Sequence, residues 1–166
     1  GRLAVAEAAR NVACAGALPI GATNCLNFGN PERPETMWQF SETVDGIAEA
    51  CHELEIPITG GNVSLYNETD GQSIYPTPVL GVVGLLADAA QALTRTFPEE
   101  GLDILLLGAA SGALDGSEYL KAVHGLVRGR PAAVDLCRER HLQMLLVGAA
   151  RDGVLRSAHD CAEGGF

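Results

Sequence analysis

The chain has 166 residues, of which 47% are apolar, so it is long enough for one ordinary domain or two small ones around a real core. Its formal net charge of −10 argues against a nucleic-acid groove, which would need a basic stripe, although a divalent cation can still bridge a phosphorylated ligand to such a protein. The five cysteines form no CxxC pair and no apolar run reaches the ~18 residues of a membrane span, so we expect a cytoplasmic protein with reduced thiols and no membrane partner.

The first sixty residues are predicted to form two helices with a strand between them. The helix at 3–16 has an apolar stripe made almost entirely of small side chains. In the strand at 20–28, Asn24 and Asn27 interrupt the apolar residues, and a buried amide must either find hydrogen-bond partners or face a ligand. Pro34 begins the second helix. The apolar stripe of this helix consists of Met37, Phe40, Val44, Ile47, Ala48, Cys51 and Leu54.

The stretch at 58–67 has the strongest character of a binding site. Gly60 and Gly61 predict a turn in which the backbone can approach another group closely, and its N–H groups can form an anion nest. Asn62 follows with a hard oxygen suited to Mg²⁺ or Ca²⁺. A strand period then places Asn62, Ser64 and Tyr66 on one face. Because glycine pairs also punctuate ordinary turns, both a metal-bridged phosphate site and a plain turn remain open at this point.

The remaining residues predict a further strand and then a second unit. Gly81 and Gly84 lie in the strand at 79–86, where they indicate close packing. The turn at 98–101 is the best candidate boundary, which divides the chain into domains at 1–98 and 99–166. The second unit is predicted to contain a buried strand at 102–108, a short helix from 117, a helix at 134–152 ended by Gly153, and a strand at 155–159.

One group of residues invites a catalytic interpretation and does not support it. Ser157, His159, Asp160 and Cys161 are crowded together, but neighbours in a strand point to opposite faces, so we expect Asp160 to cap a following helix instead. The chain also lacks GxxxxGK[ST] and GxGxxG, two common phosphate cradles. A nucleotide would therefore be held through residues 60–62 and a metal.

Five motifs together resemble a known family. They are TNCLNFGNP at 23–31, MWQF at 37–40, GGNVSLYNE at 60–68, YPTP at 75–78 and SAHD at 157–160. In order and spacing they resemble the second half of the synthetase subunit in the phosphoribosylformylglycinamidine synthase family. The resemblance implies an α/β (α+β) fold: an aminoimidazole-ribonucleotide-synthetase-like N-terminal α/β domain with a mixed or antiparallel sheet, followed by the truncated start of a C-terminal α/β domain.

The resemblance also implies a reaction. Members of this family are ATP-dependent C–N ligases of purine biosynthesis, which activate the formamide oxygen of formylglycinamide ribonucleotide with ATP and replace it by ammonia. The products are formylglycinamidine ribonucleotide, ADP and phosphate. The implied partners are the first half of the same subunit, a glutaminase subunit that supplies ammonia from glutamine, and a small assembly subunit. The family's catalytic histidine lies in the first half, so this chain alone is expected to be inactive.

Matched to the family residue by residue, four positions carry expected roles. Asn24 stands where the family has an Asp or Asn that contacts ATP, and Gly61 matches an ATP-contacting glycine. Asn62 matches a Mg²⁺ ligand and Ser64 a substrate contact; no catalytic residue is assigned. An amide at position 24 can hydrogen-bond but lacks the charge of a carboxylate.

Two alternatives to this function are left open. The chain can instead be a non-catalytic structural or auxiliary nucleotide-binding half of the same synthetase. A kinase-like enzyme of the same superfamily is less favoured, because the acidic and glycine-rich N-terminal motifs of such enzymes are not seen.

Overall fold

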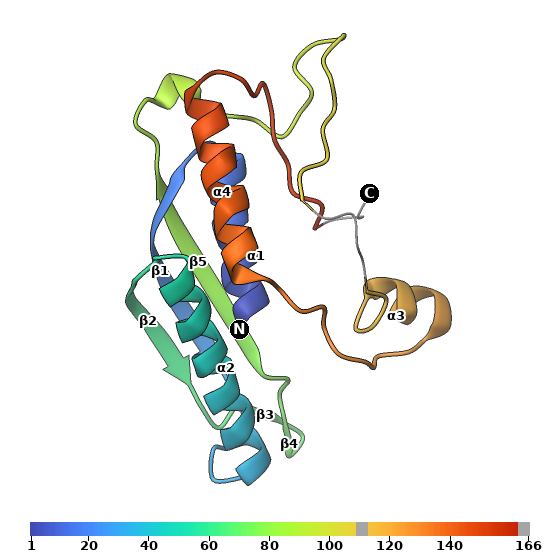
Figure 1. Ribbon diagram of the computed structural model, residues 1–166. Helices are drawn as coiled ribbons and strands as arrows, with labels where there is room; N and C mark the ends of the chain where they lie inside the picture. The colour runs from blue at the N-terminus through green and yellow to red at the C-terminus, as the bar shows by residue number, and fades with distance from the viewer. Residues whose placement is uncertain (109–112, 163–166) are drawn as a thin grey trace.

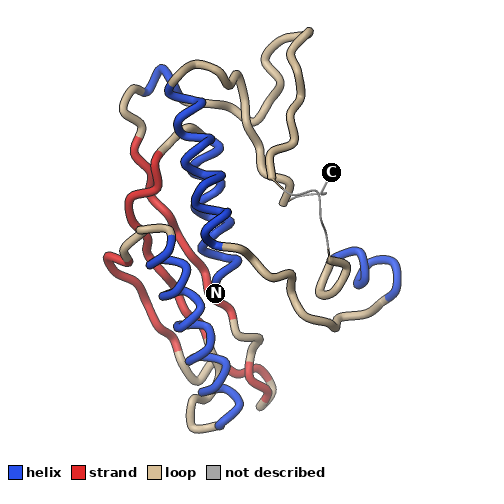
Figure 2. Tube along the Cα trace, in the orientation of Figure 1, coloured by secondary structure: helices blue, strands red, loops and turns tan. Residues whose placement is uncertain are grey.

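The computed structural model describes residues 1–108 and 113–162 as a mixed α+β arrangement, which confirms the expected fold class (Figures 1 and 2). Its elements are α1 (Arg2–Cys14), β1 (Leu18–Asn27), α2 (Pro34–Glu53), β2 (Ile58–Ser64), β3 (Glu68–Thr69), β4 (Gln72–Ser73), β5 (Thr77–Leu85), the 3-10 helix η1 (Ala89–Gln91), α3 (Glu118–His124) and α4 (Leu136–Arg151). No helix in these described ranges is long and apolar enough to cross a membrane.

The main sheet has three strands in the order β2-β1-β5. β1 runs parallel to β2 and antiparallel to β5, so the sheet is mixed, as the resemblance implied. In the parallel pair, Asn24 lies opposite Gly61, Cys25 opposite Asn62, and Asn27 opposite Ser64. This register brings residues 24–27 and 61–64 side by side although they are far apart in the sequence.

The predicted turn at Gly60 and Gly61 is wrong, because both residues lie inside β2. Successive N–H groups of an extended strand point to opposite sides, so they do not curl into an anion nest. Tyr66 also differs from the prediction: it lies beyond the end of β2 with φ of +61°, and does not continue the face that carries Asn62 and Ser64. Pairing with β1 holds Gly60 and Gly61 in an extended conformation, and the local sequence pattern could not show this pairing.

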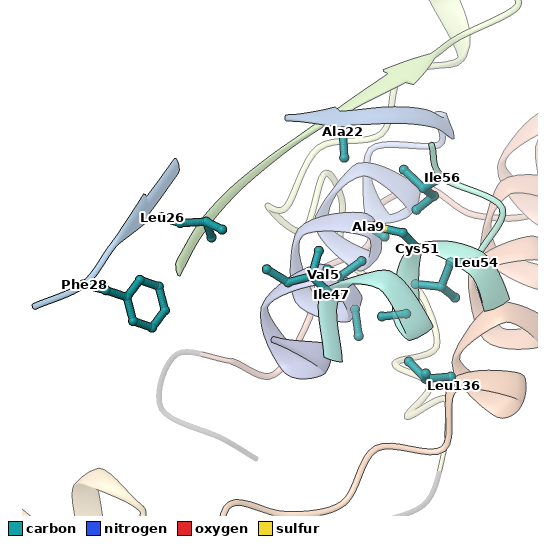
Figure 3. Packing of buried hydrophobic residues seen from close by; sticks show 12 residues of the cluster. Val5, Ala9, Ala22, Leu26, Phe28, Ile47, Cys51, Leu54, Ile56 and Leu136 are labelled. Carbon is teal, nitrogen blue, oxygen red and sulfur yellow. The ribbon is translucent and has the colours of Figure 1, made fainter. Parts of the chain in front are cut away.

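The core lies between the sheet and the helices on one of its faces (Figures 1 and 3). Small side chains on α1, including Ala6 and Ala9, are fully buried and let this helix approach closely. At Gly84 of β5 an added Cβ would lie only 2.9 Å from the Ala17 Cβ, which confirms the close packing predicted there. The core cluster consists of Val5, Ala6, Ala9, Ala22, Leu26, Phe28, Ile47, Ala50, Cys51, Leu54, Ile56 and Leu136.

The apolar stripe predicted for α2 is only partly buried. Its C-terminal members Ile47, Cys51 and Leu54 belong to the core, whereas Met37 is 47% exposed and Val44 is 38% exposed. The buried face of α2 is rotated from the predicted stripe and includes two small residues, Gly46 and Ala50. Small residues there let α1 and α2 approach closely, so the helix turns this side inward.

Residues after 98 agree with the predicted helices but not with the predicted strands. Gly153 has φ of +70°, and its N–H donates to the Ala150 carbonyl while the N–H of Val154 donates to the Ala149 carbonyl, so α4 ends there as predicted. The segment at 102–108 is not a buried strand, since Ile104 is 78% exposed. It has an apolar strand pattern but pairs with no other strand in the described part of the chain.

The predicted strand at 155–159 is reduced to one bridge between Ser157 and Thr94. Helix α4 packs against α1, and Leu136 enters the core built by the first hundred residues. The boundary at 98/99 stays a prediction.

Candidate functional site

The alternation of side chains along β1 defines a polar surface on the sheet. Ala22 and Leu26 point into the core at 2% and 3% exposure, so the residues between them at odd positions point to the opposite side. The register carries this side onto β2, because Asn62 lies opposite Cys25 and Ser64 opposite Asn27. We call the surface formed by Thr23, Cys25, Asn27, Asn62 and Ser64 the polar face.

Asn24 and Gly61 form a second pair, on the side of the sheet that faces the helices. An added Cβ on Gly61 would lie 2.6 Å from the Asn24 carbonyl oxygen and would also collide with the Asn24 side-chain oxygen. Glycine at this position therefore lets the Asn24 side chain lie across β2. The four predicted site residues thus lie on two faces of one strand pair, and the two faces meet at β2, which forms an edge of the described sheet.

Cys25 orients two amide side chains on the polar face. Its sulfur lies 3.5 Å from Asn27 Nδ2 and 3.9 Å from Asn62 Nδ2. Nδ2 of Asn62 is directed to sulfur, and its carbonyl oxygen Oδ1 makes no hydrogen bond within the described residues, so Oδ1 is available to a ligand. An amide oxygen is a suitable Mg²⁺ ligand. Asn27 thereby has a hydrogen-bond partner, one of the two outcomes expected for it; the side chain of Asn24 makes no hydrogen bond within residues 1–108 and 113–162.

Mg²⁺ is compatible with Asn62 only in a setting where the protein supplies few ligands. No group of three or more His, Cys, Asp or Glu residues that could hold a metal ion is found in the described part of the chain. Mg²⁺ commonly keeps several waters and binds through one or two protein oxygens plus substrate phosphates. The exposed Asn62 oxygen fits that second kind of site.

Ser64 is held by a residue that sequence reasoning did not single out. The side-chain Nδ2 of Asn67 donates to the carbonyl oxygens of Ser64 at 2.9 Å and Phe28 at 3.0 Å, and lies 3.1 Å from Ser64 Oγ. Ser64 Oγ in turn donates to Asn67 Oδ1 at 3.3 Å. Asn67 belongs to the motif at 60–68, so its spacing of three from Ser64 was the available signal.

The candidate site lies on an open strand surface, because every residue of β2 except Ser64 is exposed. One surface hollow lies at the C-terminal end of α2, beside Arg140, and another lies between α1 and residues 158–160. None of the four predicted residues lines either hollow.

Two cysteine thiols outside the polar face have raised pKa values. Burial raises the pKa of the Cys51 thiol, and burial together with the Asp160 carboxylate raises the pKa of the Cys14 thiol. Both thiols are therefore kept protonated.

Residues 157–161 do not converge on a catalytic or metal centre in the structure. The Asp160 side chain turns inward at 5% exposure and pairs with Arg10 at 3.8 Å, whereas His159 is 43% exposed. Asp160 thus has an electrostatic partner on α1. A helix capped by Asp160 would begin at Cys161, but residues 161 and 162 form a bend and a turn, and the residues that follow lie outside the described ranges.

Comparison with known proteins identifies the family. The family described as AIR synthase related protein, N-terminal domain, matches residues 1–86, which is more than half of the chain. The chain belongs to this family. Its matched region contains β1, β2, β5 and the whole polar face.

Relatives of this AIR synthase related chain carry one name. The phosphoribosylformylglycinamidine synthase subunit PurL of Anaeromyxobacter sp. (strain Fw109-5) is 55% identical over 163 residues, covering 98% of this chain and 21% of that protein. PurL of Moorella thermoacetica is 53% identical over 166 residues, covering 100% of this chain and 23% of that protein. The chain therefore spans less than a quarter of the length of these curated relatives.

Solved structures show the same fold. PurLQS from Thermotoga maritima matches with a TM-score of 0.51 and 32% identity, over 55% of this chain and 15% of that chain. T. maritima PurL complexed with FGAR matches with a TM-score of 0.54 and 22% identity, over 90% of this chain and 20% of that one. The second likeness reaches most of the chain and concerns the fold alone.

Proposed function

We propose that this chain is a part of phosphoribosylformylglycinamidine synthase that contacts ATP and Mg²⁺. The complete protein would convert formylglycinamide ribonucleotide, ammonia and ATP to formylglycinamidine ribonucleotide, ADP and phosphate. Identity above 50% over nearly the whole chain to proteins of that name supports the proposal.

The observation that carries the proposal is the register of the parallel pair. β1 and β2 place Asn24 opposite Gly61 and put Asn62 one step further along, so three predicted contacts from two distant motifs become neighbours. Ligands of open α/β sheets bind outside the carboxyl ends of parallel strands, and Ser64 lies at that end of β2. A function unrelated to these motifs would not explain why their residues lie together on the sheet.

In this proposal the nucleotide would bind at β2, an edge strand of the sheet in the described residues. Asn24 and Gly61 contact ATP from the side of the helices, the second through its backbone, because a side chain there would displace Asn24. Asn62 would hold Mg²⁺ through Oδ1 on the polar face, and Ser64 would contact the ribonucleotide substrate. When bound, Mg²⁺ neutralises phosphate charge and orients the transferred phosphoryl group. No group in this chain is proposed to transfer a proton.

The same proposal covers the partner subunits and the cellular location of the protein. The name of the T. maritima assembly PurLQS describes PurL together with further components. We propose that the protein containing this chain works with a glutaminase subunit and a small assembly subunit in the cytoplasm, and that the remainder of its own subunit supplies the catalytic histidine. The division of the chain into domains at 1–98 and 99–166 belongs to this proposal.

The second candidate is a structural or auxiliary nucleotide-binding role for this part of the synthetase. Its supporting observation is that the polar face contains no acid–base pair: Thr23, Cys25, Asn27, Asn62 and Ser64 supply only amides, hydroxyls and a thiol. A site of this composition can bind a nucleotide without taking part in turnover.

Turnover by the intact protein separates the two candidates. We expect Asn62→Ala to lower kcat/KM for amidine formation about 100-fold, and Ser64→Ala about 10-fold, since each removes a contact to a charged or polar reactant. The measurement is ATP-dependent formation of the amidine from formylglycinamide ribonucleotide and ammonia.

Asn30→Ala is a matched control for these variants. The Asn30 side chain accepts a hydrogen bond from the Glu32 N–H at 2.8 Å within a turn and has no place on the polar face. It should leave turnover within about 3-fold of the unchanged protein, because loss of such a contact alters local stability alone. Full turnover by folded Asn62→Ala and Ser64→Ala variants would favour the structural role, and absence of any amidine product from the unchanged protein would refute the proposed reaction.

A further inference from the structure

The side chain of Asn67 has one orientation that satisfies its surroundings. Two of its neighbours, the carbonyl oxygens of Ser64 and Phe28, can only accept hydrogen bonds, and they lie 2.9 Å and 3.0 Å from one end of the amide. That end must therefore be Nδ2, which donates. The carbonyl end, Oδ1, is left to face the Ser64 hydroxyl at 3.3 Å.

This orientation decides what the Ser64 hydroxyl can do. Nδ2 carries two hydrogens, and the two backbone carbonyls are its nearest acceptors, nearer than Ser64 Oγ at 3.1 Å. Asn67 Oδ1 can only accept, so the hydrogen of the Ser64 hydroxyl is directed to it at 3.3 Å. Oγ also lies 3.1 Å from Asn67 Nδ2, which can use only one of the two lone pairs of Oγ, so the second lone pair is left for a ligand and this hydroxyl presents an acceptor and not a donor.

Backbone hydrogen bonds hold Asn67 in position beside Ser64. β2 ends at Ser64, and Tyr66 adopts the left-handed region at φ +61°, which reverses the chain. Backbone hydrogen bonds fix the reversal: Tyr66 N–H donates to the Gly29 carbonyl at 3.0 Å and Asn67 N–H to the Phe28 carbonyl at 3.1 Å. Asn67 thus joins the C-terminal ends of β1 and β2 and is partly buried there.

We propose that Asn67 is a positioning residue that fixes the Ser64 hydroxyl as a hydrogen-bond acceptor for an N–H or O–H group of the bound ribonucleotide. This inference rests on the proposed function, because it takes Ser64 to be a substrate contact. Asn67 itself does not touch the substrate. Its effect on binding passes through Ser64, which makes the two residues a thermodynamically coupled pair.

A double-mutant cycle in the intact protein tests this coupling. The variants are Ser64→Ala, Asn67→Ala and the double variant, and the measured quantities are the dissociation constant of formylglycinamide ribonucleotide by calorimetry and kcat/KM for amidine formation. We expect each single variant to weaken substrate binding about 3- to 10-fold, the worth of one hydrogen bond. The double variant should bind no worse than Ser64→Ala, because Asn67 has nothing left to position.

Asn30→Ala, combined with Ser64→Ala in the same way, gives the matched control, and its effects should multiply. Multiplying effects for Asn67→Ala and Ser64→Ala would overturn the inference, since they would show that Asn67 supports the fold alone. The inference would fall equally if Ser64→Ala left substrate binding unchanged or if the intact protein did not bind this ribonucleotide. If the effects of Ser64→Ala and Asn67→Ala on binding are coupled but no amidine forms, the inference about Asn67 stands and the proposed reaction is refuted. If amidine forms but the two effects multiply, the proposed reaction stands and the inference about Asn67 is refuted.

Discussion

At the scale of single residues, the site depends on one missing side chain. Gly60 and Gly61 are neighbours in β2, yet an added Cβ would meet another residue only at Gly61, because Asn24 occupies that space. At Gly60 an added Cβ meets nothing within 4 Å. The absence of a side chain therefore matters only at Gly61, which shapes the predicted ATP contact together with Asn24.

This difference gives a paired prediction. Gly61→Ala should lower the free energy of unfolding by about 1–3 kcal/mol, because the new methyl group presses on the Asn24 carbonyl, a backbone atom that cannot move without shifting β1. Gly60→Ala should change it by less than about 1 kcal/mol. Urea unfolding of both variants measures the two values, and equal effects would contradict this account of the strand pair.

At the scale of elements, an ion-pair network joins α1 to α4. Arg10 Nε and Nη2 donate to the two carboxylate oxygens of Glu139 at 2.8 Å and 3.0 Å, and Gln143 donates to Glu139 at 3.0 Å. Burial alone would lower the pKa of the Arg10 guanidinium, but its hydrogen bond to Glu139 and the charges of Glu139 and Asp160 raise that pKa above its ordinary value. The charged form is thus the stable one in the folded protein.

Loss of the ion-pair network between α1 and α4 should lower the free energy of unfolding. Arg10→Met leaves the buried carboxylates of Glu139 and Asp160 without their cation, and we expect a loss of about 3–5 kcal/mol in the free energy of unfolding. Arg2→Met is the matched control, because Arg2 and Glu49 are 55% and 52% exposed and such pairs contribute less than about 1 kcal/mol.

Denaturant unfolding of the Arg10→Met and Arg2→Met variants compares the two ion pairs. The combined variant Arg10→Met with Glu139→Leu should recover part of the loss, because it removes the charge of Glu139 together with that of Arg10. Similar losses for Arg10→Met and Arg2→Met would show that the α1–α4 network adds no more to stability than a surface pair.

At the scale of the whole molecule, α1, α2, β1 and β5 were predictable because their signals are local, whereas the short strands β3 and β4 were not predicted. Pro34 starts α2 and Gly153 follows the end of α4, each for reasons of backbone conformation that hold in any fold. The failures were long-range. The extended conformation of Gly60 and Gly61 comes from pairing with β1, and the exposed segment at 102–108 has a strand pattern without a neighbouring strand in the described residues.

The candidate site shows the same division. Family resemblance could name Asn24, Gly61, Asn62 and Ser64, since their motifs are written in the sequence. It could not show that they lie on two faces of one strand pair, because that follows from the register alone. Cys25 was missed as a partner for a similar reason, because its contact with Asn62 exists only once β1 and β2 lie side by side. The same is true of the bond from Asn67 to the Phe28 carbonyl, whereas the contacts of Asn67 with Ser64 are local.

The central claim is that this strand pair binds ATP through Mg²⁺ at Asn62. Titration of Mg²⁺ into the intact protein with ATP present, followed by calorimetry, tests it most directly. For Asn62→Ala we predict at least about a 10-fold rise in the Mg²⁺ concentration needed for tight ATP binding, with Mg²⁺-free ATP binding unchanged; Asn62→Asp, which keeps an oxygen ligand, should retain the Mg²⁺ dependence. An unaltered Mg²⁺ dependence in folded Asn62→Ala would contradict the claim.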